Sequence, residues 1–525
     1  MTEHFPVLIV IAPLFGALLC GLFGMRDHRV CLPIALAALG FSLACACGLL
    51  IRVADSGPVS YFVGGWKQPR GIGIELRADG INALVLVAIA VVSIIVAVYS
   101  HRRAEHDSVS KAPAFYVLFL LLTVGLFGIT VTGDAFNLYV MVEVSSLTGY
   151  ALIAMGSQPR GRFAAFQYII MGTIGASFYL LGVGYLYLHT GALNMAQIQE
   201  ILLASSTTAV PLVAFALIMV GLWIKMAFFP LGSWLPNAYT YSPNTTGSIL
   251  APLVTKVTVY IMIRIMLSVF TWEWIFQGTS WNQLVVWMSV VAILAGSVMA
   301  LSQTDLKRML CCLIIAEVGY MVGGAWLANR WGLVGSVYHI LGDAFMTLTL
   351  FLAAGIFAKR ARIYSIDRLD RMFRRQPLVM SGFAIGALGM IGLPPTCGFF
   401  SKWFLIRGGL ESGHYEYVIA LLISSLVNAV LFFRIFEIAY FGKKPSAGHD
   451  SGAHHEEAHD EHPLPHVRVD AHATDLIPLF AAASMVILTG LGSGWISGLI
   501  QRTLDEAGVP PAEVTLPGPS ASKAP

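Results

Sequence analysis

The sequence predicts an all-α polytopic membrane protein with about fourteen transmembrane helices. Of its 525 residues, 57% are hydrophobic and only 12% are charged, which is outside the usual range of soluble globular proteins. The apolar residues gather in repeated runs of about 20, the length that an α-helix needs to cross a bilayer. A few lysines, acids and prolines interrupt these runs, and at membrane depth such residues indicate an ion path.

The apolar runs place the predicted helices in chain order. The first run lacks a basic leading segment and a cleavage site, so we expect a retained helix and not a signal peptide. The even number of runs puts both termini on one side of the membrane. The runs lie near residues 6–24, 30–51, 79–100, 113–132, 134–155, 164–188, 209–230, 245–270, 284–303, 309–328, 331–358, 379–409, 415–441 and 475–500.

Basic residues in alternate loops predict the orientation. The richest of these loops runs from Lys359 to Arg375, and another holds Arg102 and Arg103. The opposite loops contain fewer basic residues, with the segment 52–80 as the exception. Because basic loops face the cytoplasm, we expect a multi-pass protein of the bacterial inner (cytoplasmic) membrane with both termini in the periplasm.

Two proline-broken helices, near residues 230 and 395, predict a pair of inverted repeats. The break at Pro230 follows Lys225, whereas the break at Pro394–Pro395 precedes Lys402. Broken helices leave backbone groups free, which is tolerated only beside a cavity or neighbouring helices. Such breaks in corresponding halves of a transporter are typical of repeats that surround an ion site at mid-membrane.

Buried charges in the first half of the chain suggest the start of that path. Glu143 lies about nine residues into its apolar run and therefore near the middle of the bilayer. Lys225 is its natural partner, and Lys256 lies in the next apolar run. Each lysine, Lys402 included, has an alternative interpretation as a snorkelling side chain or a structural ion pair. The presence of all four residues together favours a hydrophilic axis.

The second half contributes His339, Asp343 and Glu317. His339 and Asp343 are four residues apart and share one helix face. A histidine–carboxylate pair can take up and release a proton near physiological pH, although a core histidine bonded within its own helix is the alternative. Glu317 lies in an apolar run with no obvious local partner. Lys307, at the edge of a run, is either a cytoplasmic anchor or a member of the path.

Other functions find little support. The seven cysteines form no CxxC pair, so we expect no haem, iron–sulfur or other redox cofactor and no metal site. The net charge of +3 is too small to indicate binding to nucleic acid. The stretch from His455 to His459 matches the HExxH zinc-protease pattern, but it lies in a His- and acid-rich loop where chance matches arise.

Four motifs in order resemble a known family. They are TGDAFNLYVMVEVSSLTGYALIA, KMAFFPLGSWLPNAYTYSP, SQTDLKRML and GLPPTCGFFSKW. From about residue 80 to residue 440, the chain resembles the antiporter-like subunits of respiratory complex I and of Mrp-type sodium/proton antiporters. The stretches GDAFNLYVMVE and LHTGALNMAQI are most similar to the D-type component of Mrp antiporters and its relatives in membrane-bound hydrogenases.

The resemblance implies roles for five residues. Glu143 and Lys225 would be the interacting pair of the first half-channel, and Lys256 the connecting residue. His339 would belong to the central axis, and Lys402 would be the terminal lysine of the second half-channel. Protons would then move along a hydrated axis, and changes in the Glu143–Lys225 pair would couple the subunit to its neighbours.

The apolar runs, the composition and the resemblance together divide the chain into five regions. Residues 1–112 would form N-terminal transmembrane helices, 113–270 the first half-channel and 284–441 the second. A His- and acid-rich cytoplasmic loop would follow at 442–474, and the last transmembrane helix and a disordered tail at 475–525.

The chain departs from the family pattern at several positions. Gly232 stands where a histidine is usual, and Glu317 replaces a neutral polar residue. Asp343 and Thr347 occupy places where complex I subunits often carry histidine and lysine. These departures weaken a strict complex I role and suggest altered ion coupling.

We therefore expect a proton-translocating, non-enzymatic subunit of a multi-subunit cation/proton antiporter, without a cofactor. Its partners would be other membrane subunits, the lipid bilayer, protons and sodium or another monovalent cation. The first alternative is a proton-pumping membrane-arm subunit of a complex I-like NADH-quinone oxidoreductase or a membrane-bound hydrogenase. An energising subunit of an inorganic carbon uptake system and a purely structural scaffold are further alternatives.

Overall fold

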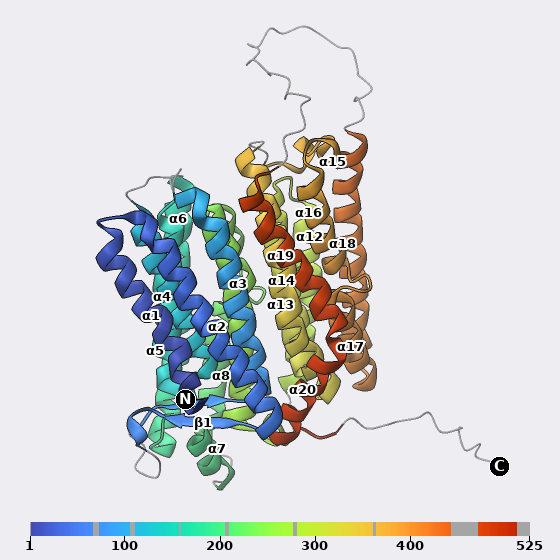
Figure 1. The fold of residues 1–525 in the computed structure, drawn as a ribbon. Helices are drawn as coiled ribbons and strands as arrows, with labels where there is room; N and C mark the ends of the chain where they lie inside the picture. Colours follow the sequence, from blue (N-terminus) through green and yellow to red (C-terminus); the bar gives the residue numbers. More distant parts are fainter. Residues whose placement is uncertain are drawn as a thin grey trace, which may run out of the picture.

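A computed structural model describes most of the chain and confirms the predicted all-α membrane architecture (Figure 1). The described residues are 2–66, 73–104, 111–156, 159–204, 209–276, 281–360, 364–442 and 471–511. The HExxH match from His455 to His459, most of the predicted loop around it and the end of the tail lie outside these ranges.

The N-terminal half places its helices side by side (Figure 1). Its elements are η1 (Thr2–His4), α1 (Phe5–Gly24), η2 (His28–Val30), α2 (Cys31–Ser56), β1 (Val59–Phe62), η3 (Val63–Gly65), β2 (Glu75–Ala78), α3 (Gly80–Ala104), α4 (Ala112–Val131), α5 (Ala135–Ala154), α6 (Pro159–Thr190), α7 (Met195–Ala204), α8 (Ala209–Lys225), α9 (Trp234–Thr240), α10 (Asn244–Ile265), the π-helix η5 (Met266–Phe270) and α11 (Trp272–Phe276).

The C-terminal half forms the other side of the bundle (Figure 1). Its elements are α12 (Trp281–Leu301), α13 (Leu306–Trp326), α14 (Arg330–Arg360), η6 (Ile366–Arg368), α15 (Met372–Arg375), α16 (Pro377–Ile391), α17 (Cys397–Glu411), α18 (Tyr415–Phe441), α19 (Ala473–Leu491) and α20 (Ser493–Glu506).

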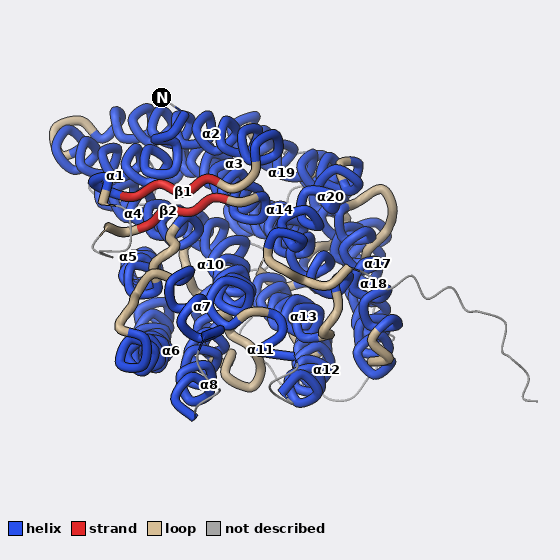
Figure 2. The backbone as a smooth tube through the Cα atoms, turned by 90° about the horizontal axis from the view of Figure 1, so that it is seen from below, coloured by secondary structure: helices blue, strands red, loops and turns tan. Residues whose placement is uncertain are grey.

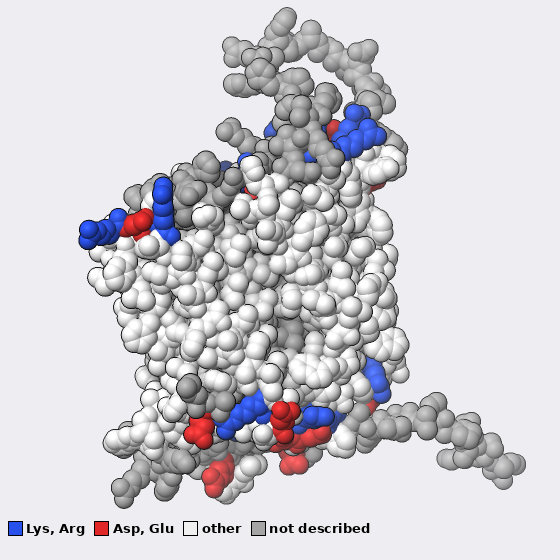
Figure 3. Space-filling view, in the orientation of Figure 1, with Lys and Arg blue, Asp and Glu red and all other residues white. Residues whose placement is uncertain are grey.

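The helices are long and apolar enough to cross a membrane. Twelve candidate spans lie in the described residues, and α8 and α16 are shorter apolar helices. On the face shown in Figure 3, charged side chains gather at the two ends of the molecule and leave a broad belt without them. Because lipid tails cannot solvate charge, this belt corresponds to the hydrocarbon region of a bilayer.

Both predicted helix breaks are present. Helix α8 ends at Lys225 and α9 begins at Trp234, while α16 ends before Gly392 and α17 begins at Cys397. Prolines in the two gaps lack the N–H group that would continue a helix, and Gly392 adopts the left-handed conformation that terminates α16. The runs 209–230 and 379–409 are therefore interrupted and not continuous. The inverted-repeat relationship remains a prediction.

Two elements differ from the sequence-based expectation. Strands β1 and β2 form an antiparallel hairpin within the segment 52–80, in which Val59 pairs with Ala78. The hairpin lies across the end of the bundle that also holds the N-terminus and α20 (Figures 1 and 2). The last predicted span, 475–500, is two helices, α19 and α20, that meet at Gly492.

The interior is built around three helices. The apolar windows of α13 and α14 are completely buried within the protein, and that of α10 is mostly buried. Helix α10 packs against α14 and thereby joins the two halves, toward the middle of the molecule (Figure 2). Helix α19 crosses over α3 and α14 (Figure 1). A charge near the middle of α10, α13 or α14 consequently lies deep inside the bundle.

Candidate functional site

The first buried ion pair joins α5 and α8. Lys225 is the last residue of α8, and its Nζ donates hydrogen bonds to Glu143 Oε1 at 3.2 Å and Ser146 Oγ at 2.8 Å. Glu143 and Ser146 are three residues apart, so both side chains lie on one face of α5. The structure thus brings together the two residues that the sequence suggested as partners. It adds Ser146, which the sequence pattern did not indicate.

A second ion pair connects the two halves of the molecule. Lys256 of α10 lies 2.9 Å from Asp343 Oδ2 of α14, and both side chains are almost completely buried. Lys256 Nζ also donates to the Ala251 carbonyl at 3.1 Å, and the Thr347 hydroxyl donates to Asp343 Oδ1 at 2.7 Å. Asp343 and Thr347, two of the departures from the family pattern, therefore lie in direct contact.

A third contact corrects the sequence-based pairing of His339. Its Nε2 lies 2.5 Å from Glu317 Oε2 of α13, and its Nδ1 lies 2.9 Å from Ser401 Oγ of α17. His339 and Asp343 do share a helix face, but the hydrogen-bond partners of His339 come from other helices. Glu317, for which the sequence showed no partner, is paired with His339. Spacing along one helix cannot reveal which side chain a neighbouring helix presents.

Lys402 occupies the second helix break. Its Nζ donates to the Met390 carbonyl at 2.7 Å, the Ile391 carbonyl at 3.3 Å and Ser425 Oγ at 3.0 Å. The last carbonyls of a helix lack intrahelical partners and carry the negative end of the helix dipole. The break at the end of α16 therefore supplies neutral oxygen atoms that stabilise a buried ammonium group.

These contacts define a row of ionisable side chains across the bundle, which we call the charged axis. The helices that carry it pack against one another in the order α8, α10, α14 and α17, with α5 beside α10 and α13 beside α14. The structure thereby brings all seven predicted site residues into one row of neighbouring helices. The charged axis consists of Glu143, Lys225, Lys256, Asp343, Glu317, His339 and Lys402.

The centre of the axis has the donor types of a metal site. One ligand atom each from Glu317, His339 and Asp343 lie within 4.8 Å of one another. Both His339 nitrogens and both Asp343 oxygens already contact protein groups, including the Lys256 ammonium. The nearby ammonium charge opposes the binding of a metal cation by these groups.

Lys307 lies near the start of α13, and the sequence left its role open. Its side chain is buried beside the C-terminal end of α9, the end away from the helix break. Its Nζ donates to the Ser242 carbonyl at 3.0 Å and to Asn244 Oδ1 at 3.3 Å. Ser242 lies in the turn between α9 and α10, and Asn244 is the first residue of α10. Lys307 is thus attached to the protein interior and does not extend into the surrounding solvent as a simple anchor would.

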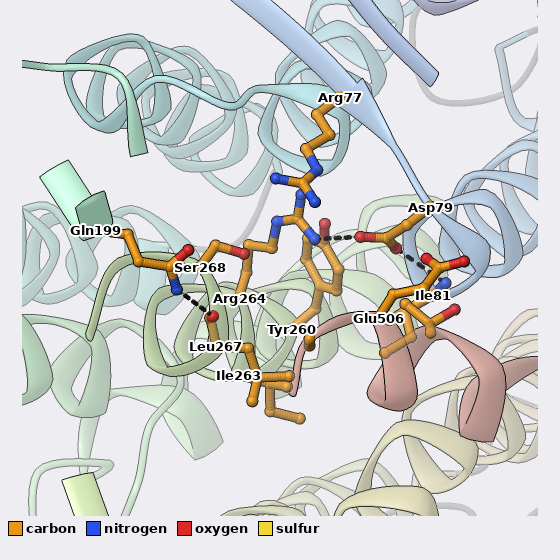
Figure 4. Close-up of a pocket in the computed structure, with 12 residues that line it drawn as sticks. Arg77, Asp79, Ile81, Gln199, Tyr260, Ile263, Arg264, Leu267, Ser268 and Glu506 are labelled. Atoms are coloured by element: carbon orange, nitrogen blue, oxygen red, sulfur yellow. Dashed lines mark hydrogen bonds and ion pairs between the residues drawn. The ribbon is translucent and has the colours of Figure 1, made fainter. Parts of the chain in front are cut away.

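The structure also shows a polar cavity that sequence reasoning missed (Figure 4). The cavity has a volume of about 100 Å³ and lies beside the C-terminal end of α10, at the hairpin end of the bundle. Arg264 forms an ion pair with Asp79 there, and Arg77 and Glu506 also line the cavity. The sequence contains one sign of this cavity. Arg264 follows Lys256 by eight residues, about two helical turns, so a second basic residue lies on the same face of α10.

Comparisons with known proteins agree with this architecture. A family model described as NADH:quinone oxidoreductase/Mrp antiporter, TM matches residues 132–428. The chain is 39% identical to NADH-quinone oxidoreductase subunit N of Desulforudis audaxviator (strain MP104C), over 96% of this chain and 99% of the relative. It is 28% identical to the D-type component of the Na(+)/H(+) antiporter of Bacillus subtilis (strain 168), over 96% and 97% of the two chains.

Two solved structures share the fold. A chain of the membrane-bound sulfane sulfur reductase, an archaeal respiratory membrane complex, superimposes with a TM-score of 0.84 at 27% identity, covering 96% of this chain and 97% of that one. A chain of the Mrp complex from Dietzia sp. DQ12-45-1b gives a TM-score of 0.82 at 23% identity, covering 97% and 98%.

Proposed function

Because the chain belongs to the NADH:quinone oxidoreductase/Mrp antiporter transmembrane family, we propose that it is a proton-translocating subunit of a multi-subunit cation/proton antiporter. The observation that supports this function best is the charged axis. Buried ionisable groups destabilise a membrane protein unless they are paired, and their presence in a row is typical of proton relays. The exchanged cation would be sodium or another monovalent cation.

The ion pairs suggest how protons would move. While Glu143 stays beside Lys225, its carboxylate stabilises the ammonium charge in an apolar interior. Movement of the carboxylate away from Lys225 would leave that charge uncompensated, and Lys225 would pass its proton toward the Lys256–Asp343 pair, where the Asp343 carboxylate is the base. The Glu317–His339 contact would then take up the proton, and Lys402 would release its own proton in response. In this scheme residues 113–270 and 284–441 act as the two half-channels.

The exposure of Glu143 supports a neighbouring membrane subunit. Its side chain is 24% exposed, although it lies at membrane depth on α5. Phe136 and Leu147 flank it as exposed apolar residues on the same helix. A carboxylate next to lipid tails is unfavourable, so we propose that another subunit of the complex covers this face of α5. Contact with that subunit would control the position of the Glu143 carboxylate.

A second candidate function follows from the 39% identity to a protein named NADH-quinone oxidoreductase subunit N. In that case the chain would be a non-redox, proton-pumping membrane-arm subunit, and another subunit would supply the redox energy. The names of the four relatives described above contain nothing that favours inorganic carbon uptake.

Proton movement in everted vesicles would test the main proposal. The vesicles should carry the complete set of subunits, and a pH-sensitive dye should report proton movement after addition of sodium. We expect Lys225→Ala and Glu143→Ala to abolish the signal while the complex still assembles. Lys111→Ala, at an exposed position before α4, is the control and should leave it unchanged. Sodium-dependent proton movement in both axis variants would contradict the proposal.

A further inference from the structure

A file of buried hydroxyl groups continues from the first ion pair toward the end of the bundle opposite the hairpin. Glu143, Ser146 and Tyr150 are three and four residues apart, so they follow one face of α5. Tyr150 lies about 10 Å beyond Glu143 along the helix. Its ring meets the ring of Tyr168 on α6 at 4.5 Å, edge to face. The polar face of α5 therefore passes on to a second helix.

Aromatic packing continues the file to α9. The Tyr168 ring stacks on Trp234 at 4.1 Å, and Trp234 in turn contacts the ring of Tyr239. The indole Nε1 of Trp234 donates to the Ile224 carbonyl at 3.0 Å, next to Lys225. Trp234 thus holds Tyr168 and Tyr239 in fixed positions beside the helix break.

The far end of the file reaches the turn between α9 and α10. Thr240 donates a hydrogen bond to Cys311 Sγ at 3.7 Å, and Ser242 Oγ donates to the Tyr239 carbonyl at 2.8 Å. The Ser242 carbonyl accepts from Lys307. At the partly exposed Tyr241, the Arg160 guanidinium lies 5.9 Å from the ring. Polar groups therefore extend from the ion pair to the edge of the bundle.

Two of these hydroxyls are unusual for buried tyrosines. The hydroxyl oxygens of Tyr150 and Tyr239 are buried and have no partner with hydrogen-bond geometry in the described part of the chain. Ser146 nevertheless lies close enough to the Tyr150 hydroxyl, and Tyr168 to the Tyr239 hydroxyl, for a loose side-chain hydrogen bond. Buried polar groups are nearly always satisfied, so small rotations of these side chains are expected to close the two hydrogen bonds.

A glycine on α6 leaves the space that the Tyr150 hydroxyl occupies. A β-carbon at Gly172 would overlap that hydroxyl oxygen. Glycine is less favourable than alanine inside a helix by roughly 0.5–1 kcal/mol. The glycine at this position therefore leaves room for the phenol group of Tyr150.

We propose that Ser146, Tyr150, Tyr168 and Tyr239 form a proton relay that reloads Lys225 from the face of the membrane at the α9–α10 turn. We call these four residues the hydroxyl relay. This inference rests on the proposed function, since it requires Lys225 to have passed a proton toward Lys256.

The proton balance of the relay is simple. At each step an O–H bond forms on the side facing the turn, and another O–H bond breaks on the side facing Lys225. Each hydroxyl gains one proton and loses one, so none of them carries charge after a complete transfer. The last proton leaves Ser146, whose oxygen lies 2.8 Å from Lys225 Nζ, and converts the amine to an ammonium group.

Removal of single hydroxyl groups would test the relay in vesicles that carry the complete complex. We expect Tyr150→Phe and Tyr239→Phe each to slow sodium-dependent proton movement by about tenfold or more, because each interrupts a proton-transfer path. Gly172→Ala should act in the same direction by displacing the Tyr150 hydroxyl. Tyr179→Phe is the matched control on α6, since its hydroxyl donates to the Ala135 carbonyl away from the relay.

Heavy water separates a relay defect from a structural one. If proton transfer has become the slow step, replacement of H2O by D2O should slow Tyr150→Phe more strongly than the wild type. Two results would overturn the hydroxyl relay but leave the proposed function intact. One is an equal isotope effect in the wild type and in Tyr150→Phe, and the other is full activity of both Phe variants when Lys225→Ala is inactive. Full activity of Lys225→Ala would overturn the proposed function itself.

Discussion

At the residue scale, the ion pairs of the charged axis differ in their contact with the surroundings. Lys256 and Asp343 are sealed inside the protein, with side-chain exposures of 1% and 0%. Glu143 is 24% exposed and would be accessible to the neighbouring subunit that we propose. Regulation is therefore expected at the Glu143–Lys225 pair, whereas the Lys256–Asp343 pair connects the two halves.

The buried Lys256–Asp343 pair leads to a stability prediction. Asp343→Asn should destabilise the folded protein by about 3–5 kcal/mol, because it leaves the Lys256 ammonium buried without a counter-charge. The double variant Lys256→Met with Asp343→Asn should recover most of this loss, since no unpaired charge remains. Thermal unfolding in detergent would measure both effects. A double variant no more stable than Asp343→Asn would contradict the explanation.

Proton movement provides the complementary measurement for the same two variants. The double variant should remain inactive even when its stability returns, because its axis lacks two ionisable groups. Activity in the double variant would show that protons bypass α10.

The sequence predicted the ionisable residues better than their contacts. Lysines and acids in apolar runs are conspicuous, so all seven members of the charged axis were identifiable. Their partners depend on which helix faces which, and this information is absent from local spacing. His339 illustrates the point, since its i+4 neighbour is Asp343 but its contacts are Glu317 and Ser401. Ser146 and Ser401 gave no signal, because serines are common in apolar helices.

At the element scale, α20 is an amphipathic helix that closes the hairpin end of the bundle. Arg330, at the start of α14, donates hydrogen bonds to Asp505 at 2.6 Å and to the Gln501 carbonyl at 2.7 Å. Glu506, at the end of α20, lines the polar cavity that contains Asp79. The position of α20 therefore depends on two carboxylates in different surroundings.

These carboxylates predict opposite pH effects on the docking of α20. The hydrogen bond from Arg330 lowers the pKa of Asp505. The ionised Asp505 therefore stabilises the docked α20 above the ordinary pKa of about 3.9, and this stabilisation is lost as pH falls through the lowered pKa. Burial, with Asp79 nearby, raises the pKa of Glu506. Protonated Glu506 therefore stabilises the docked α20 below the ordinary pKa of about 4.3, and this stabilisation is lost as pH rises through the raised pKa.

Hydrogen exchange of residues 493–506 would measure this docking. We expect exchange to increase as pH rises through the Glu506 titration, after correction for the intrinsic pH dependence of exchange. Glu506→Gln should remove that increase, and Asp505→Asn should remove the loss of protection in acid. An unchanged profile in Glu506→Gln would show that the cavity does not control α20.

The helix breaks and the hairpin show what local sequence can predict about elements. Both breaks were predictable because proline acts within the chain itself, through its missing N–H group. The β1–β2 hairpin was not, since its strands have only four residues each and depend on the helix ends beneath them. The division between α19 and α20 was hidden because the Gly-rich segment around Gly492 is apolar enough to continue a span.

At the scale of the whole molecule, the exposed face of α5 predicts an interface. Leu147 is 60% exposed and lies one turn from Glu143. Leu147→Trp should prevent the neighbouring subunit from packing closely, while its apolar side chain remains compatible with lipid. Leu22→Trp on α1, where the side chain is similarly exposed, is the control.

Copurification of the other subunits with a tagged chain would measure the effect. We expect Leu147→Trp to reduce copurification severalfold without lowering the amount of the chain itself in the membrane. Normal copurification would indicate that lipid, and not protein, covers the α5 face. Equal losses in Leu147→Trp and Leu22→Trp would point to a general folding defect.

The composition of the charged axis also limits how many protons it can hold. With His339 neutral, ammonium groups and carboxylates balance, so one extra proton leaves a surplus unit charge in a weakly polar interior. Two such surplus charges about 15 Å apart would repel by about 1 kcal/mol at an effective dielectric constant of about 20. If the axis carries protons as proposed, a second surplus proton would be disfavoured by about fivefold while the first is present, and successive turnovers would tend to be ordered in time.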